Sequence, residues 1–180
     1  MYHVSGMIDP GFSVDMVLMP RSATGTASAH GVSWRVVVVG DDIWLSGSAL
    51  WKATLPAVRA AQLGDGWVHV TDGGAAFGHA QILSKLFRGI ATVIFGPHSG
   101  LKVTGRTTVG GRPAVELRNA TDVYDVAGSG TPYPLRWLDT ATPGPNGQPC
   151  GITLDGFDAA AVAVTPPPDV VGTVTPSPHS

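Results

Sequence analysis

The chain has 180 residues, of which 43% are hydrophobic and 13% are charged, and its formal net charge is −2. The hydrophobic fraction excludes a disordered chain, and the missing basic excess argues against a nucleic-acid-binding protein. The length is enough for one domain with a hydrophobic core. The 24 glycines and 15 prolines indicate many turns between short strands.

The first part of the chain predicts a series of strands. Apolar and polar residues alternate over Phe12–Met19, and Asp9-Pro10-Gly11 predicts a turn after a strand at residues 2–8. The small polar segment Thr24–His30 predicts an edge strand, whereas Val32–Val39 is apolar on both faces and predicts a central strand. Residues 43–46 predict the returning strand after a turn.

The middle of the chain predicts two helices separated by a short strand at Trp67–Val70. The first is expected over Thr54–Leu63, with Thr54 as its N-cap and Pro56 in its first turn. The second is expected over Phe77–Ile90, where apolar residues recur at helical spacing. An amphipathic helix must bury its apolar stripe, and the apolar face of the sheet is the available surface.

The last part predicts a hairpin over Leu101–Arg118, with Gly110-Gly111 as its two-residue turn. Further strands are expected at 123–127, 135–138, 152–154 and 159–164, the last two as a closing hairpin. Pro166-Pro167-Pro168 is expected to end regular structure, with an extended or mobile tail behind it. The whole pattern predicts about nine to eleven strands.

The sequence offers no set of residues for catalysis. It contains no nucleophile elbow, phosphate-binding loop or zinc-protease motif, and its histidines are scattered. His69, beside Trp67, is interpreted as a surface or packing residue, and the carboxylate pair Asp41-Asp42 as part of a turn. Cys150 is the one cysteine, so no intrachain disulfide can form. We therefore expect no enzyme, no cofactor and no metal site.

Two interpretations of the interior stay open at this point. In one, the five tryptophans fill a sheet–helix core; in the other, some of them form the wall of a cavity for an apolar ligand. The sequence contains no run of about 18 or more apolar residues, so no transmembrane helix is expected. Met1 is followed directly by strand-like sequence, without the features of a signal peptide.

Several segments resemble the mycobacterial LppX/LprG-type lipoproteins and their actinobacterial relatives. They are GRTTVGGRPAVELR, DVYDVAGSGTPYPLRW, GDDIWLSGSALW, LGDGWVHV and LDGFDAAAVAVTPPPDVV, and together the resemblance covers residues 4 to about 171. Its most specific part combines Gly111-Arg112-Pro113-Ala114 with the stretch from Gly130 to Arg136.

The resemblance implies a fold similar to the LolA and LolB carriers. We accordingly expect a mainly β (α+β) domain, a curved antiparallel half-barrel sheet with two short helices packed on its concave face. Residues 1–171 would form this single domain and residues 172–180 a Pro-rich tail. Members of the family bind or carry lipids or lipidated molecules in the cell envelope, anchored through an N-terminal lipidated cysteine.

This sequence departs from the family at its N-terminus. It lacks the signal peptide, the lipobox cysteine and the helix that usually precedes the first strand, and a truncated or misassigned start is the simplest explanation. An envelope location, on the outer face of the membrane or in a periplasm-like space, follows if the native N-terminus carries a lipoprotein signal. A cytoplasmic location follows if Met1 is the true start.

The leading hypothesis is a non-enzymatic envelope protein that holds a lipid or acylated glycolipid in an apolar cavity. No nucleic-acid partner is expected, and peripheral membrane association would come from the missing anchor. The alternative is a structural or interaction module with a filled core that binds a protein partner. The residues expected to line the cavity are Met16, Trp34, Val36, Ile82, Leu83, Leu86, Phe87, Val115, Leu117 and Trp137.

Overall fold

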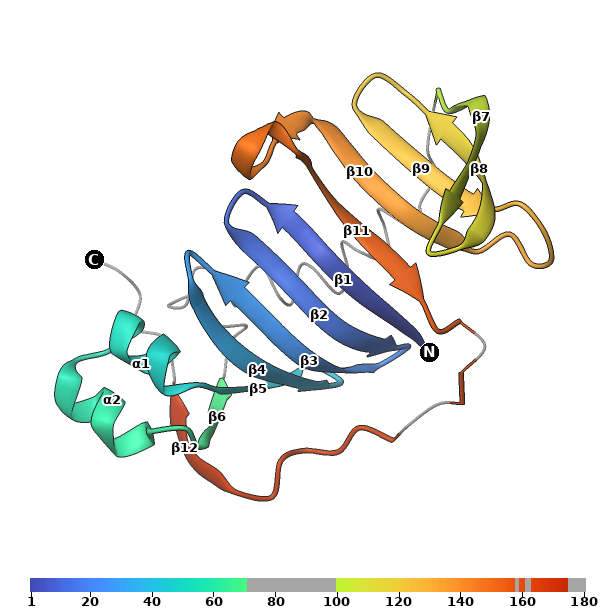
Figure 1. The fold of residues 1–180 in the computed structure, drawn as a ribbon. Helices are drawn as coiled ribbons and strands as arrows, with labels where there is room; N and C mark the ends of the chain where they lie inside the picture. Colours follow the sequence, from blue (N-terminus) through green and yellow to red (C-terminus); the bar gives the residue numbers. More distant parts are fainter. Residues whose placement is uncertain (71–99, 158, 161–162, 175–180) are drawn as a thin grey trace.

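The computed structural model describes residues 1–70, 100–157, 159–160 and 163–174 (Figure 1). Twelve strands in this part of the chain form one open, curved sheet, accompanied by two short helices. The fold class expected from the sequence is thereby confirmed. The strands are β1 Tyr2–Asp9, β2 Phe12–Met19, β3 Ser22–Ala29, β4 Val32–Val39, β5 Asp42–Ser46, β6 Trp67–Val70, β7 Lys102–Val109, β8 Arg112–Arg118, β9 Asp122–Ala127, β10 Pro134–Pro143, β11 Pro149–Asp155 and β12 Val170–Val174.

The sheet order is β12-β6-β5-β4-β3-β2-β1-β11-β10-β9-β8-β7. Two antiparallel meanders, β1 to β6 and β7 to β11, meet where β1 pairs with β11 in the middle of the sheet. The chain then returns along one side of the sheet, and β12 adds to β6 as a parallel strand (Figure 1). All other pairings between neighbouring strands in this order are antiparallel.

The strands of the first meander confirm the sequence pattern with one exception. β1, β2 and β4 lie where alternation predicts them, and Val37, on the second face of β4, is buried as expected of a central strand. The prediction that Thr24–His30 is an edge strand is wrong, because β3 lies between β2 and β4. Its small side chains fit a close-packed interior position: Ala23 and Ala27 are both buried.

The helices differ from the expected ones. α2 spans Ala57–Leu63 and matches the helix predicted over Thr54–Leu63 except for a later start, whereas α1, which spans Ser48–Thr54, was not predicted. Thr54 ends α1 and donates its hydroxyl to the carbonyl of Leu50, and Pro56 is the N-cap of α2. The N-cap role predicted for Thr54 is therefore wrong. The helix predicted over Phe77–Ile90 lies outside the described residues.

The end of the chain also differs from the prediction. Residues 159–160 and 163–164 are not in a strand, so β11 has no hairpin partner there, whereas β12 forms after the prolines that were expected to end regular structure. Phe157 stacks against Tyr2 and Tyr133, at centroid distances of 5.6 and 4.5 Å. The returning segment is thus fixed to the sheet where it leaves β11. The division into a domain 1–171 and a tail 172–180 stays a prediction.

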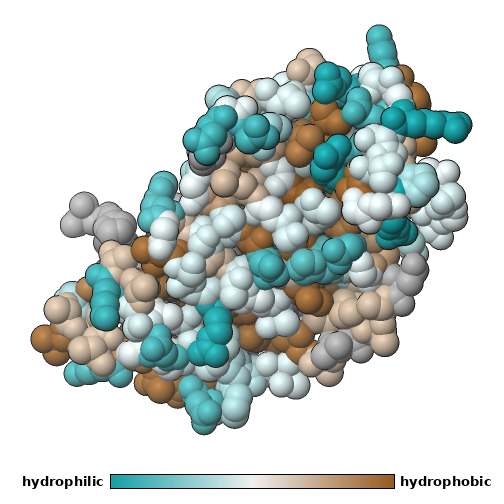
Figure 2. Space-filling view, in the orientation of Figure 1, coloured by the Kyte–Doolittle hydropathy of each residue, from teal (hydrophilic) through white to brown (hydrophobic). Residues whose placement is uncertain are grey.

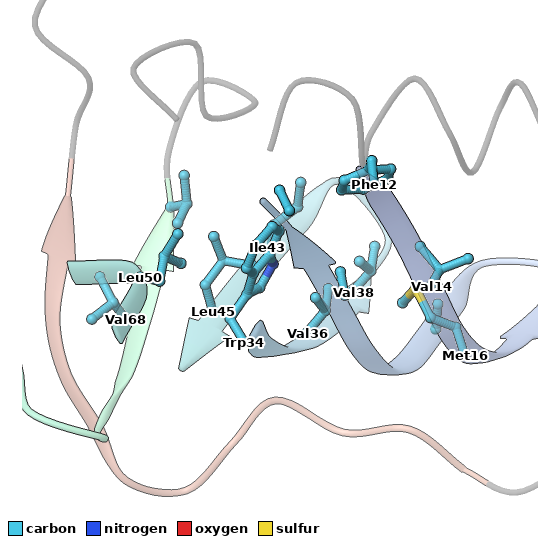
Figure 3. Packing of buried hydrophobic residues seen from close by; sticks show 14 of the residues in the cluster. Phe12, Val14, Met16, Trp34, Val36, Val38, Ile43, Leu45, Leu50 and Val68 are labelled. Carbon is cyan, nitrogen blue, oxygen red and sulfur yellow. The ribbon is translucent and has the colours of Figure 1, made fainter. Parts of the chain in front are cut away.

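The core lies on one face of the sheet, which we call the inner face. Side chains from β1 to β6 and β11 meet there with Leu50 and Trp51 of α1 and with Ala60 and Leu63 of α2. Figure 3 shows side chains of β2, β4 and β5 projecting from this face. The opposite, outer face carries polar and intermediate side chains over much of its area (Figure 2).

Candidate ligand-binding face

Two rows of residues cross the inner face of the sheet. Residues directly opposite each other in neighbouring strands point to the same side, so the register identifies each row. One row runs from the second meander to the first through Leu117, Tyr124, Trp137, Ile152, Gly6, Val14, Ala27 and Trp34. The other runs through Leu154, Val4, Met16, Gly25, Val36, Leu45 and Val68. The inner face is therefore apolar across both meanders.

The register brings the six described candidate residues onto this one face. Met16, Trp34 and Val36 lie in the core and are 1%, 4% and 0% exposed. Trp137 is half-buried and packs against the core. Leu117 shares its row, and Val115, two positions earlier in β8, points to the same side and is half-buried too. Ile82, Leu83, Leu86 and Phe87 lie outside the described residues.

Two glycines in the rows allow neighbouring strands to come unusually close. Gly6 and Gly25 have φ angles of +143° and +155°, which residues with a side chain rarely adopt. A Cβ at Gly25 would lie 2.2 Å from the carbonyl oxygen of Asp15, and one at Gly6 would lie 2.3 Å from that of Gly151. Glycines inside strands mark bends and close backbone approach. The inner face therefore carries no side chain at these two positions.

The apolar character of the inner face continues to the edge of the sheet. Val103 lies opposite Leu117 on β7 and is 69% exposed. A bulge between Val103 and Gly105 then reverses the alternation, so that Val109 points to the outer face and packs with Ala114, Ala127 and Leu135. The hairpin predicted from its Gly110-Gly111 turn is present, but its apolar side chains are divided between the two faces of the sheet.

A buried ion pair on the outer face of the second meander was missed from the sequence. Asp125 is 0% exposed, and its Oδ2 accepts a hydrogen bond of 2.6 Å from Nε of Arg136. The second carboxylate oxygen, Oδ1, is buried without a hydrogen-bond partner. An aspartate flanked by apolar residues inside a strand, as in Val123-Tyr124-Asp125-Val126, is the signal that could have indicated it.

On the inner face, Tyr124 and Trp137 bring polar groups next to the apolar rows. The indole N–H of Trp137 donates to a carboxylate oxygen of Asp122 over 3.0 Å. Burial, and secondarily the charge of Asp122, raises the pKa of Tyr124 to about 12. The phenol therefore stays protonated at physiological pH and keeps its hydrogen-bond donor.

The outer face carries separate polar clusters. His3 on β1 bonds Asp15 through Nε2 at 2.9 Å and lies 3.3 Å from Asp155 through Nδ1. Hydrogen bonding to Asp15 is the main cause that raises the pKa of His3. His69 stacks on Trp44 and bonds Asp42 over 2.8 Å, which places it as a packing residue.

A surface pocket of about 310 Å³ lies beside Arg35 and Asp65. Arg35 stacks over Trp67 at 4.8 Å and donates to the hydroxyl of Ser46 over 2.7 Å. Asp65 accepts the backbone N–H of Ser48 at the start of α1, and this bond is the main cause that lowers its pKa. These polar groups hold β4 and β5 to the loop before β6, so their contacts have a structural role in the fold.

The described residues contain no group of three or more His, Cys, Asp or Glu side chains that could hold a metal ion. None of the helices in this part of the chain is long and apolar enough to cross a membrane. Cys150 is buried, and burial raises the pKa of its thiol. A buried thiol with a raised pKa is a poor nucleophile.

The fold is similar to that of LprF from Mycobacterium bovis. The TM-score is 0.56, and the match covers 93% of this chain and 89% of LprF at 17% sequence identity. At this identity the likeness concerns the fold, and it supports the LppX/LprG-type fold that the sequence resemblance implied.

Two further structures are much less similar. One is the complex of MucA and MucB from Pseudomonas aeruginosa, matched with a TM-score of 0.35 at 15% identity over 89% of this chain and 54% of the other. The other is MucB in complex with MucA(peri), matched with a TM-score of 0.32 at 17% identity over 92% of this chain and 57% of the other. No protein-family model matches the sequence, and no curated protein sequence matches it either.

Proposed function

We propose that this chain is a non-enzymatic protein of the cell envelope that binds a lipid or lipidated ligand against the inner face of its half-barrel. The observation that carries the proposal is the continuity of that face. It is apolar from the buried core at Met16 and Val36 to the half-buried Val115 and Leu117, and at the edge strand β7 it carries the exposed Val103 beside Arg106. An apolar surface that is still partly accessible suits acyl chains.

The polar requirements of such a site are small. Binding would come from apolar surface removed from water, at about 25 cal/mol per Å². The indole N–H of Trp34 is buried without a hydrogen-bond partner, and an unmet donor of this kind costs free energy. An ester or hydroxyl oxygen of a ligand could accept that hydrogen bond. The binding residues we propose are the ten named from the sequence, including Ile82, Leu83, Leu86 and Phe87.

A second candidate function follows from how completely some residues of the inner face are buried. Met16, Val36 and Val4 are almost completely buried, as expected of side chains that fill an interior rather than line a cavity. In that case the half-barrel is a scaffold, and its surface binds a protein partner. The envelope location is part of the first proposal. It is proposed because the fold is similar to that of LprF.

Native mass spectrometry of gently purified protein, followed by organic extraction and lipid analysis, separates the two candidates. We expect a stoichiometric adduct that extracts as an acyl-chain lipid. A mass equal to that of the chain alone, unchanged after incubation with envelope lipid extract, would favour the scaffold.

A pair of variants tests the face itself. Leu117→Asp places a carboxylate on the inner face, and we expect it to lower ligand occupancy at least tenfold, because burying an unpaired charge is costly. Arg118→Asp is the control, since Arg118 is the next residue of β8, is exposed and points to the outer face. Equal losses from both variants would contradict the assignment of the inner face.

A further inference from the structure

The β7–β8 hairpin concentrates positive charge in a chain that is negative as a whole. Between Lys102 and Arg118 the sequence has four cations and a single anion, Glu116, whereas the formal net charge of the whole chain is −2. The cations are Lys102, Arg106, Arg112 and Arg118, and all four are exposed. Figure 2 shows hydrophilic residues gathered at the upper right, over these strands.

These cations are not neutralised within the described part of the chain. None of the four forms an ion pair or a side-chain hydrogen bond with a described residue, and Glu116 accepts instead from the hydroxyl of Thr104 over 2.7 Å. Lys102 and Arg118 lie directly opposite each other in the register. Like charges in that position repel and destabilise the pair of strands. An anionic surface would relieve this repulsion.

Among the described strands, the hairpin lies at one end of the sheet. β7 is the last strand of the sheet in this direction, so no described strand covers it. Lys102, Arg112 and Arg118 point to the outer face and Arg106, opposite Val115, to the inner face. The cations therefore surround the edge of the sheet, where Val103 adds an exposed apolar side chain.

We propose that the β7–β8 hairpin is a docking surface for an anionic lipid bilayer. Cations on both faces and on two strands suit a diffuse layer of many anionic headgroups better than a single acidic peptide along β7. Each Lys or Arg near an anionic membrane strengthens binding about fivefold, and salt screens the attraction within about 10 Å. The inference stands independently of the ligand proposed for the inner face.

Vesicle co-sedimentation with the full chain tests the inference. We expect binding to vesicles of phosphatidylcholine and phosphatidylglycerol in equal amounts, no binding to pure phosphatidylcholine, and release at high salt. The double variant Arg112→Ala/Arg118→Ala should bind at least tenfold more weakly. Both residues point to the outer face, so extraction of lipid from the purified double variant reports separately on the inner-face ligand.

The matched control is Arg21→Ala/Lys52→Ala, which removes two exposed cations distant from the hairpin in the sheet order. It should bind like the unaltered chain. Equal binding to neutral and anionic vesicles, an equal loss in the control, or binding of an acidic peptide without binding of anionic vesicles would overturn the inference. Far-UV circular dichroism of both variants verifies that each is folded.

Discussion

Asp125 is a carboxylate removed from water that receives one charged hydrogen bond, from Arg136. Arg136→Ala would leave that carboxylate buried without a counter-charge, and removal of one partner of a buried pair is expected to cost about 3 kcal/mol. Urea unfolding measures the loss. Arg112→Ala, an exposed cation on the same sheet, should change the free energy of unfolding by less than about 0.5 kcal/mol.

For single residues, the sequence predicts which face of a strand a side chain lies on, but not which side chain of another strand it contacts. Alternation put Met16 on one face of its strand and Trp34 and Val36 on one face of theirs, and the pairing through β3 makes these the same face. Alternation gave no partner for Asp125, since Arg136 is opposite only after β9 and β10 pair with a register shift near Pro134. Whether the ten predicted residues bind a ligand stays a prediction.

At the scale of a strand, Gly25 controls how closely β2 and β3 pack. Gly25→Ala adds a Cβ that would meet the backbone of Asp15 and Met16, at a φ angle that alanine avoids. We expect a loss of about 1–3 kcal/mol in the free energy of unfolding, the range for overfilled interiors. The measurement is thermal or urea unfolding of the purified variant.

Gly105→Ala is the matched control for this prediction. Gly105 also lies in a strand, but a Cβ there would meet nothing within 4 Å. Its effect should be clearly smaller than that of Gly25→Ala. Similar losses at the two positions would mean that close backbone approach at Gly25 is not what requires glycine.

Whole elements were predictable where local chemistry decides them. Gly110 and Gly111 both have positive φ angles, as the tight turn requires, and β7 and β8 follow on either side. The break between α1 and α2 falls at Leu55-Pro56, where Leu55 is extended as a residue before proline prefers, but α1 itself was not expected from the local pattern. The interior place of β3 and the parallel addition of β12 depend on contacts between distant segments.

At the scale of the molecule, one pairing joins the two meanders, and His3 lies on it between Asp15 of β2 and Asp155 of β11. Because the pKa of His3 is raised above its ordinary value of about 6.5, protonation stabilises the folded state. This contribution is complete below the ordinary pKa and is lost as pH rises through the raised one. The stability advantage of the unaltered chain over His3→Asn should therefore shrink as the pH rises above the ordinary histidine pKa of about 6.5.

Urea unfolding of both proteins below and above this pH measures the difference. Parallel pH profiles for the two proteins would contradict the role of His3, whatever their absolute stabilities. The experiment reports on the join between the meanders, since both carboxylates belong to strands that flank β1.

The central place of β1 has a consequence for synthesis. One edge of β1 is covered by β2 within the first 19 residues, but the other waits for β11, which ends at Asp155. At about 5–20 residues per second, the ribosome leaves that edge open for roughly 7 to 27 seconds. An open strand edge invites pairing with other chains. A nascent chain of this protein would therefore benefit most from a chaperone that shields its very first strand.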